Sequence, residues 1–162
     1  MNNYVQGALN NKNVKAFLAM IRQFESASDY GVIYGGSHFT DFSAHPDIKI
    51  PFVNPNRAPH ADGSPNDWST AAGAYQINYP TWLTIQAVAF LPDFSASSQD
   101  EAAIWLLQTR GSLRDIIAGN FQSALNTASQ TWASLPGSVS GQPQKTFQIA
   151  LRAYTGNGGQ LA

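Results

Sequence analysis

Cysteine is absent from the chain, so neither a disulfide bond nor a thiolate can contribute to its fold or chemistry. Charge is scarce as well, because Asp, Glu, Lys and Arg make up only 12% of the 162 residues, about half the usual share. The net charge of −1 and the lack of a basic run argue against a nucleic-acid ligand. No apolar run approaches the ~18 residues that a membrane span needs. The remaining surface is neutral and polar, which suits an uncharged ligand rich in hydroxyl groups.

The N-terminal residues lack the pattern of a signal peptide, which is a basic segment followed by an apolar one. We therefore expect the protein to be made in the cytoplasm. The three histidines, His38, His45 and His60, have no close spacing with another metal-ligating side chain on one element. The sequence thus predicts neither a metal site nor a cofactor.

Only two glutamates occur, and Glu25 is the more informative because it ends a helical pattern of apolar residues. These residues recur at i, i+3, i+4 and i+7 and are Val14, Phe17, Leu18, Ile21 and Phe24. The spacing predicts an amphipathic helix over residues 13–26, with Asn13 as its N-cap. Glu25 lies one turn after Ile21, near the buried stripe, where desolvation raises the pKa of a carboxyl group and suits it to general acid catalysis. The alternative is a helix-end glutamate that turns back to water.

The rest of the chain predicts a small strand region within a mainly helical domain, which is an α+β fold. Residues 30–36 and 37–42 are typical of two strands joined by a glycine turn, and the five prolines in 43–69 predict an irregular loop. A helix is predicted from Pro80 to Val88, and another after the capping-box pattern that begins at Ser98, which makes Glu101 a helix cap. Shorter helices are expected over 113–117, 121–128 and 146–154. We expect one domain, 1–162, with its core at about 13–155 and a disordered tail, 156–162.

The order of these pieces resembles the lysozyme superfamily, in which a glutamate at the end of the first long helix faces a cleft between a β lobe and a helical lobe. Short sequence motifs make the resemblance closest to the lambda-phage endolysin family of lytic transglycosylases. The resemblance covers roughly residues 13–155. The motifs lie at residues 15–18, with Glu25 and Ser26, and at 32–36, 39–46, 72–77 and 132–137.

This resemblance implies that Glu25 is the catalytic acid and that the substrate is bacterial peptidoglycan. Such enzymes cleave the β-1,4 bond between N-acetylmuramic acid and N-acetylglucosamine and close a 1,6-anhydro ring on the muramic sugar. A phage endolysin of this kind would wait in the host cytoplasm until a separate holin-type protein releases it. We expect it to act as a monomer on the periplasmic peptidoglycan.

The resemblance also implies which residues line the cleft. Gly73, Ala74, Tyr75 and Gln76 would lie opposite the acid, where Gly73 lets the backbone approach a sugar and Gln76 bonds an acetamido group or orients Glu25. A core position is the alternative for Tyr75. Further binding candidates are the hairpin residues Tyr34, His38 and Phe39, of which Phe39 is at least as well suited to the core, and Gln142.

The chain departs from the family at Gly31, where the family has an acid, and at Ser140, where it often has tyrosine. Asp29 and Asp41 are the acids nearest to Glu25 in sequence, and each has a turn or cap explanation. The lack of an obvious second carboxylate favours transglycosylation. A muramidase that hydrolyses the same bond and a non-catalytic glycan-binding module remain alternatives.

Overall fold

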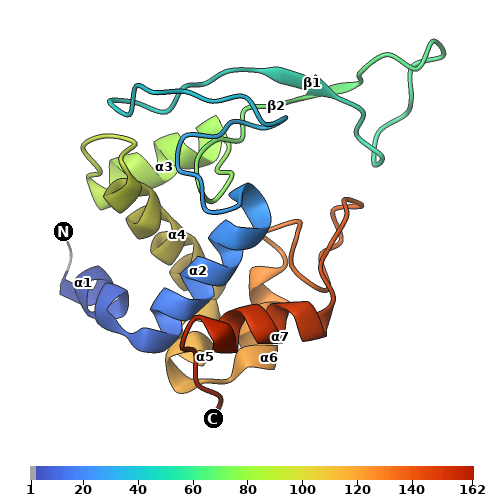
Figure 1. Ribbon diagram of the computed structural model, residues 1–162. Helices are drawn as coiled ribbons and strands as arrows, with labels where there is room; N and C mark the ends of the chain where they lie inside the picture. Colours follow the sequence, from blue (N-terminus) through green and yellow to red (C-terminus); the bar gives the residue numbers. More distant parts are fainter. Residues whose placement is uncertain (1–2) are drawn as a thin grey trace.

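Helices are the predominant regular structure in the computed structural model, which describes residues 3–162 (Figure 1). Their order confirms an α+β arrangement with a small antiparallel sheet. The elements are α1 (Asn3–Asn10), α2 (Lys12–Ser26), β1 (Ile50–Phe52), β2 (Asp67–Ser69), α3 (Tyr79–Ala89), α4 (Ala96–Arg110), α5 (Ser112–Ala118), α6 (Phe121–Ala128) and α7 (Phe147–Gly156).

Helix α2 is the predicted amphipathic helix, and its apolar stripe is buried against α1, α5 and α7. The side chain of Phe17 meets the rings of Phe121 and Tyr154 edge to face. The N-cap is Asn11 rather than Asn13, because the Asn11 side chain accepts hydrogen bonds from the backbone N–H groups of Asn13 and Val14. Helix α1, which precedes this cap, was not predicted.

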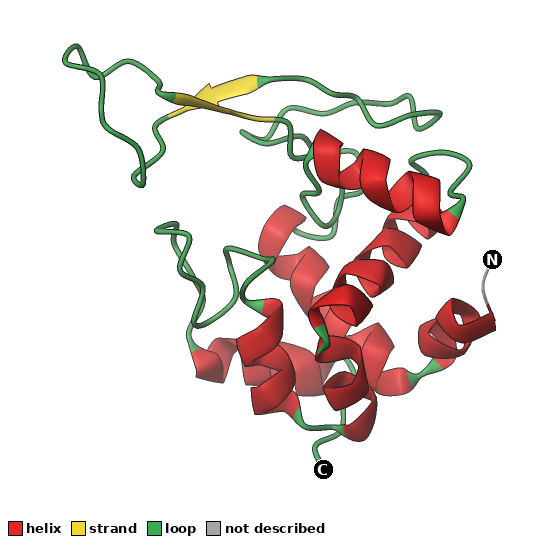
Figure 2. Cartoon of the chain, turned by 180° about the vertical axis from the view of Figure 1, so that it is seen from behind, coloured by secondary structure: helices red, strands yellow, loops and turns green. Residues whose placement is uncertain are grey.

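The sheet lies in a segment that the prolines had marked as irregular. Strands β1 and β2 pair antiparallel, with Ile50 opposite Ser69 and Phe52 opposite Asp67. Pro51 is tolerated because each strand of a two-stranded sheet is an edge strand. Figure 2 shows the strands and their long loops at one end of the helical part. The segment predicted to be an irregular loop thus contains the two paired strands.

The predicted hairpin over 30–42 is largely wrong. One antiparallel bridge, between Val32 and His38, closes the Gly35–Gly36 turn, but no ladder follows. Ile33 instead forms a bridge with Ala72, and the Tyr34 N–H donates to the carbonyl of Ala71. Pairing with the 71–77 segment thus takes the place of the predicted second strand.

Helix α4 begins at Ala96, so Ser98 and Glu101 lie inside it and the predicted cap at Glu101 is wrong. Ser98 is held instead by the carboxylate of Asp93, which also accepts the N–H of Ser95 and forms the turn before the helix. Glu101 is buried, with only 6% of its surface exposed.

The predicted disorder of the tail is also wrong. The N–H of Gln160 donates to the Asn13 side chain at 2.9 Å, and the N–H of Ala162 donates to the carbonyl of Gly119 at 3.1 Å. These bonds hold the end of the chain against α2 and α5. Within the described part of the chain, no helix has both the length and the apolar character that crossing a bilayer requires.

Candidate active site

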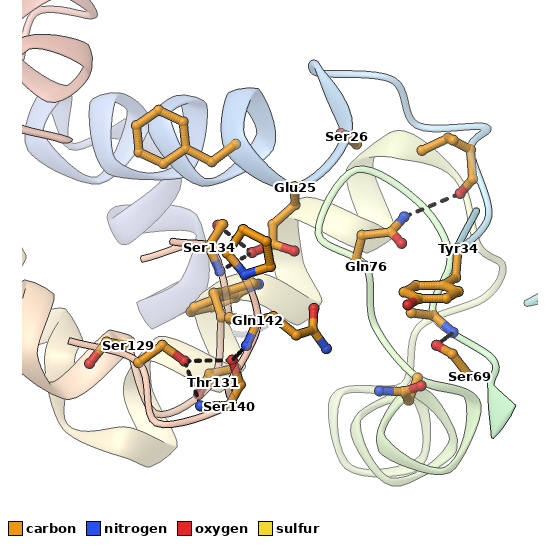
Figure 3. Close-up of a pocket in the computed structure, with 18 of the residues that line it drawn as sticks. Glu25, Ser26, Tyr34, Ser69, Gln76, Ser129, Thr131, Ser134, Ser140 and Gln142 are labelled. Carbon is orange, nitrogen blue, oxygen red and sulfur yellow. Dashed lines mark hydrogen bonds between the residues drawn. The ribbon is translucent and has the colours of Figure 1, made fainter. Parts of the chain in front are cut away.

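A cleft of about 640 Å³ opens between the exit of α2, the 32–36 turn and the loop before α7 (Figure 3). Glu25 lies in the last turn of α2, as the helical pattern predicted, and it lines this cleft, as the resemblance implied. Helix α2 ends one residue later, at Ser26, because the C-cap residue Ala27 adopts a left-handed conformation, with φ of 53°. The carboxyl group therefore stands at the boundary between the helical core and the cleft.

Ser134 holds the Glu25 carboxyl group from the opposite wall. Its hydroxyl donates to Oε1 of Glu25 at 2.5 Å, and its backbone N–H approaches the same oxygen at 3.3 Å. Burial raises the pKa of Glu25 above its ordinary value, although these two hydrogen bonds favour the charged form and oppose the rise. A carboxyl group with a raised pKa and a fixed orientation can serve as a general acid.

Among the described residues that line the cleft, Glu25 is the one acidic side chain. Asp29 and Asp41 are occupied in turns, where they accept the N–H groups of Gly31 and Ser43. The bond from Gly31 is the main reason that the pKa of Asp29 is lowered. The rest of the cleft wall is neutral and rich in hydroxyl and amide groups, which suits an uncharged ligand.

Three of the predicted binding residues line the cleft: Tyr34, Gln76 and Gln142. Figure 3 shows Gln76 and Tyr34 across the cleft from Ser134 and Ser140. The Gln76 side chain donates to the carbonyl of Gly73 at 3.0 Å, so it is directed by its own loop rather than by Glu25. The contacts of Tyr34, Gln76 and Gln142 with a glycan stay predictions.

Gly73, Ala74 and Tyr75 do not line the cleft, and their predicted contact with sugar is therefore corrected. Ala74 and Tyr75 are buried, and a Cβ on Gly73 would meet the Gln99 side chain instead of a ligand. The Tyr75 hydroxyl donates to Asp100 at 2.6 Å, and burial together with this carboxylate raises its pKa well above the ordinary value. These residues support the cleft wall from behind.

His38 and Phe39 also lie outside the cleft lining. His38 pairs with the carboxylate of Asp29 at 2.7 Å, and the ring of Phe39 packs on Phe42 and Phe94 in the core. The hairpin that would have directed them toward a sugar is not formed. No cluster of metal-ligating side chains occurs within residues 3–162 as far as they are described.

Ser134 was missed as a functional residue, although it lies in one of the motifs that carry the resemblance. Asn78 and Ser138 were missed too, and both line the cleft. Asn56, in the β1–β2 connection, donates to the carbonyl of Ser140 at 3.0 Å and so links the two lips of the cleft. Only three-dimensional proximity reveals these residues, because about 110 residues separate Ser134 from Glu25 in sequence.

Comparison with solved structures defines the class. The fold matches that of bacteriophage lambda lysozyme complexed with a chitohexasaccharide, with a TM-score of 0.80, 31% identity, and coverage of 94% of this chain and 97% of that one. A second structure of the lambda lysozyme matches with a TM-score of 0.76 at the same identity. The protein thus has the architecture of the lysozyme-like enzymes that cleave glycans.

Sequence comparison identifies the family. The Endolysin family matches residues 15–161. The endolysin of Escherichia phage P2 is 34% identical over 161 residues, which cover 91% of this chain and 94% of that protein. The endolysin of Escherichia phage lambda is 34% identical over 160 residues, with coverage of 93% and 94%. The chain belongs to the endolysin family.

Proposed function

We propose that this endolysin is a peptidoglycan lytic transglycosylase that cleaves the β-1,4 bond between N-acetylmuramic acid and N-acetylglucosamine. The observation that carries the proposal is the single acidic side chain in a neutral cleft, held by Ser134 and partly removed from water. One carboxyl group suffices when the nucleophile is a hydroxyl of the substrate. A hydrolase with two protein carboxylates would need the second about 5 to 9.5 Å away.

The reaction needs Glu25 in two protonation states. The protonated carboxyl donates its proton to the glycosidic oxygen as the C1–O bond breaks, and the 2-acetamido group of the muramic sugar stabilises the positive charge at C1. The resulting carboxylate then takes the proton of the C6 hydroxyl, whose oxygen attacks C1 and closes the 1,6-anhydro ring. The enzyme thus returns to its starting protonation state without consuming water.

The biological role proposed with this chemistry is lysis of the host cell by a phage. The protein would be made in the host cytoplasm and would act as a monomer on the periplasmic peptidoglycan. A separate holin-type protein would give it access. The neutral, cysteine-free composition and the family membership support this role.

Mass spectrometry of digested peptidoglycan tests the proposal. Transglycosylation leaves 1,6-anhydromuramic ends, which are lighter by one water than the reducing ends that a muramidase would leave. Glu25→Gln should abolish product formation, while Glu101→Gln, which changes the only other glutamate, should keep the chemistry. Reducing ends would replace the proposal by hydrolysis. Full lytic effect of the Glu25→Gln protein would identify a non-catalytic binding module.

A further inference from the structure

A second groove of about 690 Å³ continues from the catalytic cleft toward the sheet and the start of α3. The two cavities share the side chains of Tyr34, Ser69, Asn78 and Gln142, so a ligand can pass from one to the other along a common wall. The groove can therefore hold a part of the substrate that leaves the cleft along this wall.

The charge of this groove distinguishes it from the cleft. Apart from Glu25, the cleft lining has no Asp, Glu, Lys or Arg among the described residues, whereas Asp47, Lys49 and Asp67 line the groove. Asp67 is already occupied by Arg57 at 3.1 Å and by the side chain of Asn54 at 2.7 Å. Within the described part of the chain, Lys49 makes no ion pair or hydrogen bond.

The Asp47 carboxylate is likewise without a hydrogen-bond partner among the described residues, since its backbone N–H alone is bonded, to His45. The groove thus offers one available cation and one available anion on the segment that leads into β1. A sugar ring, which carries no charge, would use neither. A ligand with both carboxylate and amino groups would use both.

An exposed aromatic ring completes the groove. Trp68 lies on β2 opposite Pro51, and 63% of its surface is exposed, which is unusual for the largest apolar side chain. Its ring offers a flat apolar surface beside the charged groups. Amphipathic aromatic residues of this kind commonly bind peptides, because they provide a large contact area with little conformational freedom to lose.

We propose that this groove binds the peptide stem that branches from the muramic sugar. Peptidoglycan stems carry free carboxylates and, at a diamino acid, an amino group, which match Lys49 and Asp47 respectively. The stem leaves the glycan strand beside the reacting bond, and the shared wall lets it turn from the cleft into the groove. This inference rests on the proposed function, because it assigns the second half of the same substrate.

Binding to the Glu25→Gln protein tests the inference without turnover. The probes are a peptidoglycan fragment of defined length with its peptide stems and the same fragment after an amidase has removed them. Lys49→Ala, in the Glu25→Gln background, should weaken binding of the stem-bearing fragment about two- to fivefold, the range of one exposed ion pair. It should leave binding of the stripped fragment unchanged. A stem with amidated carboxylates should bind no more tightly to the Glu25→Gln protein than to the Lys49→Ala variant in that background.

Lys15→Ala is the matched control because Lys15 is an exposed lysine on α2, ten residues or about 15 Å along the helix from Glu25. This variant should alter binding of neither fragment. Equal weakening of both fragments by Lys49→Ala would overturn the inference and make the groove a further sugar site. If Lys49→Ala weakened binding of neither fragment, Lys49 would stay solvated instead of contacting the stem, and the inference would also be overturned. Failure of the Glu25→Gln protein to bind either fragment would count against the proposed function itself.

Discussion

Gly73→Ala should be among the most damaging small substitutions in the segment that supports the cleft wall from behind. Gly73 has a φ of +76°, and a Cβ at this position would lie 2.2 Å from Oε1 of Gln99 and 2.7 Å from its Cδ. Gln99 cannot swing aside into water, because only 1% of its surface is exposed. Its amide group accepts the N–H of Ala74 at 2.8 Å and donates to the carbonyls of Phe94 and Tyr30 at 2.8 and 3.2 Å.

Two costs add up in this variant. The left-handed backbone costs a residue with a Cβ about 1–2 kcal/mol. Displacing the Gln99 amide breaks three buried hydrogen bonds, each of about 1 kcal/mol. We therefore expect a loss of about 4 kcal/mol in the free energy of unfolding and a fall in Tm of roughly 8–16 °C. Gly36→Ala isolates the backbone cost, since Gly36 has a φ of +92° and nothing within 4 Å of its Cβ position.

Equilibrium denaturation of the single variants and of the Gly73→Ala/Gln99→Ala pair measures this coupling. Truncating Gln99 removes the clash, so the double variant should be destabilised by clearly less than the sum of the two single changes. Equal losses in Gly73→Ala and Gly36→Ala would refute the steric argument. Additive losses in the double variant would do the same.

Three further outcomes follow from the hydrogen bonds and burial of α2. The raised pKa of Glu25 means that its ionised form opposes folding, so Glu25→Gln should be more stable than the wild type at neutral pH. The difference in unfolding free energy should vanish at a pH below the ordinary carboxyl pKa of about 4.3, and a pH-independent difference would contradict the assignment. Ser134→Ala should raise that pKa further, move the alkaline limb of kcat/KM to higher pH and lower kcat; an unshifted limb would show that the hydroxyl does not act on the charge. Asn11→Ala should cost about 1 kcal/mol in unfolding free energy without changing kcat/KM, and an unchanged stability would rule out the cap.

The sequence predicted the helix that carries Glu25 because its signal is local and periodic. A buried stripe at helical spacing forces the residue one turn after Ile21 toward the same side, and Glu25 lies there. The predicted N-cap of α4 was wrong for an equally local reason. Ser98 to Glu101 matches a capping box, but Asp93 organises the preceding turn and the helix starts at Ala96.

The cleft wall could be predicted only in part, because the sequence does not show which side of a loop faces a ligand. In the 73–76 segment, Gln76 lines the cleft while Tyr75 is buried in the core, and the backbone at Gln76 has a φ of +48°. The partner of Glu25 was invisible for another reason: Ser134 comes from a distant part of the chain, and a lone serine carries no periodic signal. The sheet was misplaced because the glycine turn favoured a hairpin over 30–42, whereas β1 and β2 lie among the prolines of 43–69, which edge strands tolerate.

Helix α4 connects α2 to the cleft wall, which explains how the carboxyl group of Glu25 can be held in place in a protein with so little charge. Gln99 fixes the backbone of Ala74, and the neighbouring Asp100 accepts the hydroxyl of Tyr75 and pairs with Arg22 of α2 at 3.3 Å. Two adjacent residues of one helix thus set the position of the loop and of the helix that carries the acid. Preorganisation of this kind lowers the reorganisation needed during the reaction. Lys49 and Asp47 of the second groove take no part in these bonds, so their replacement should leave the position of Glu25 unchanged.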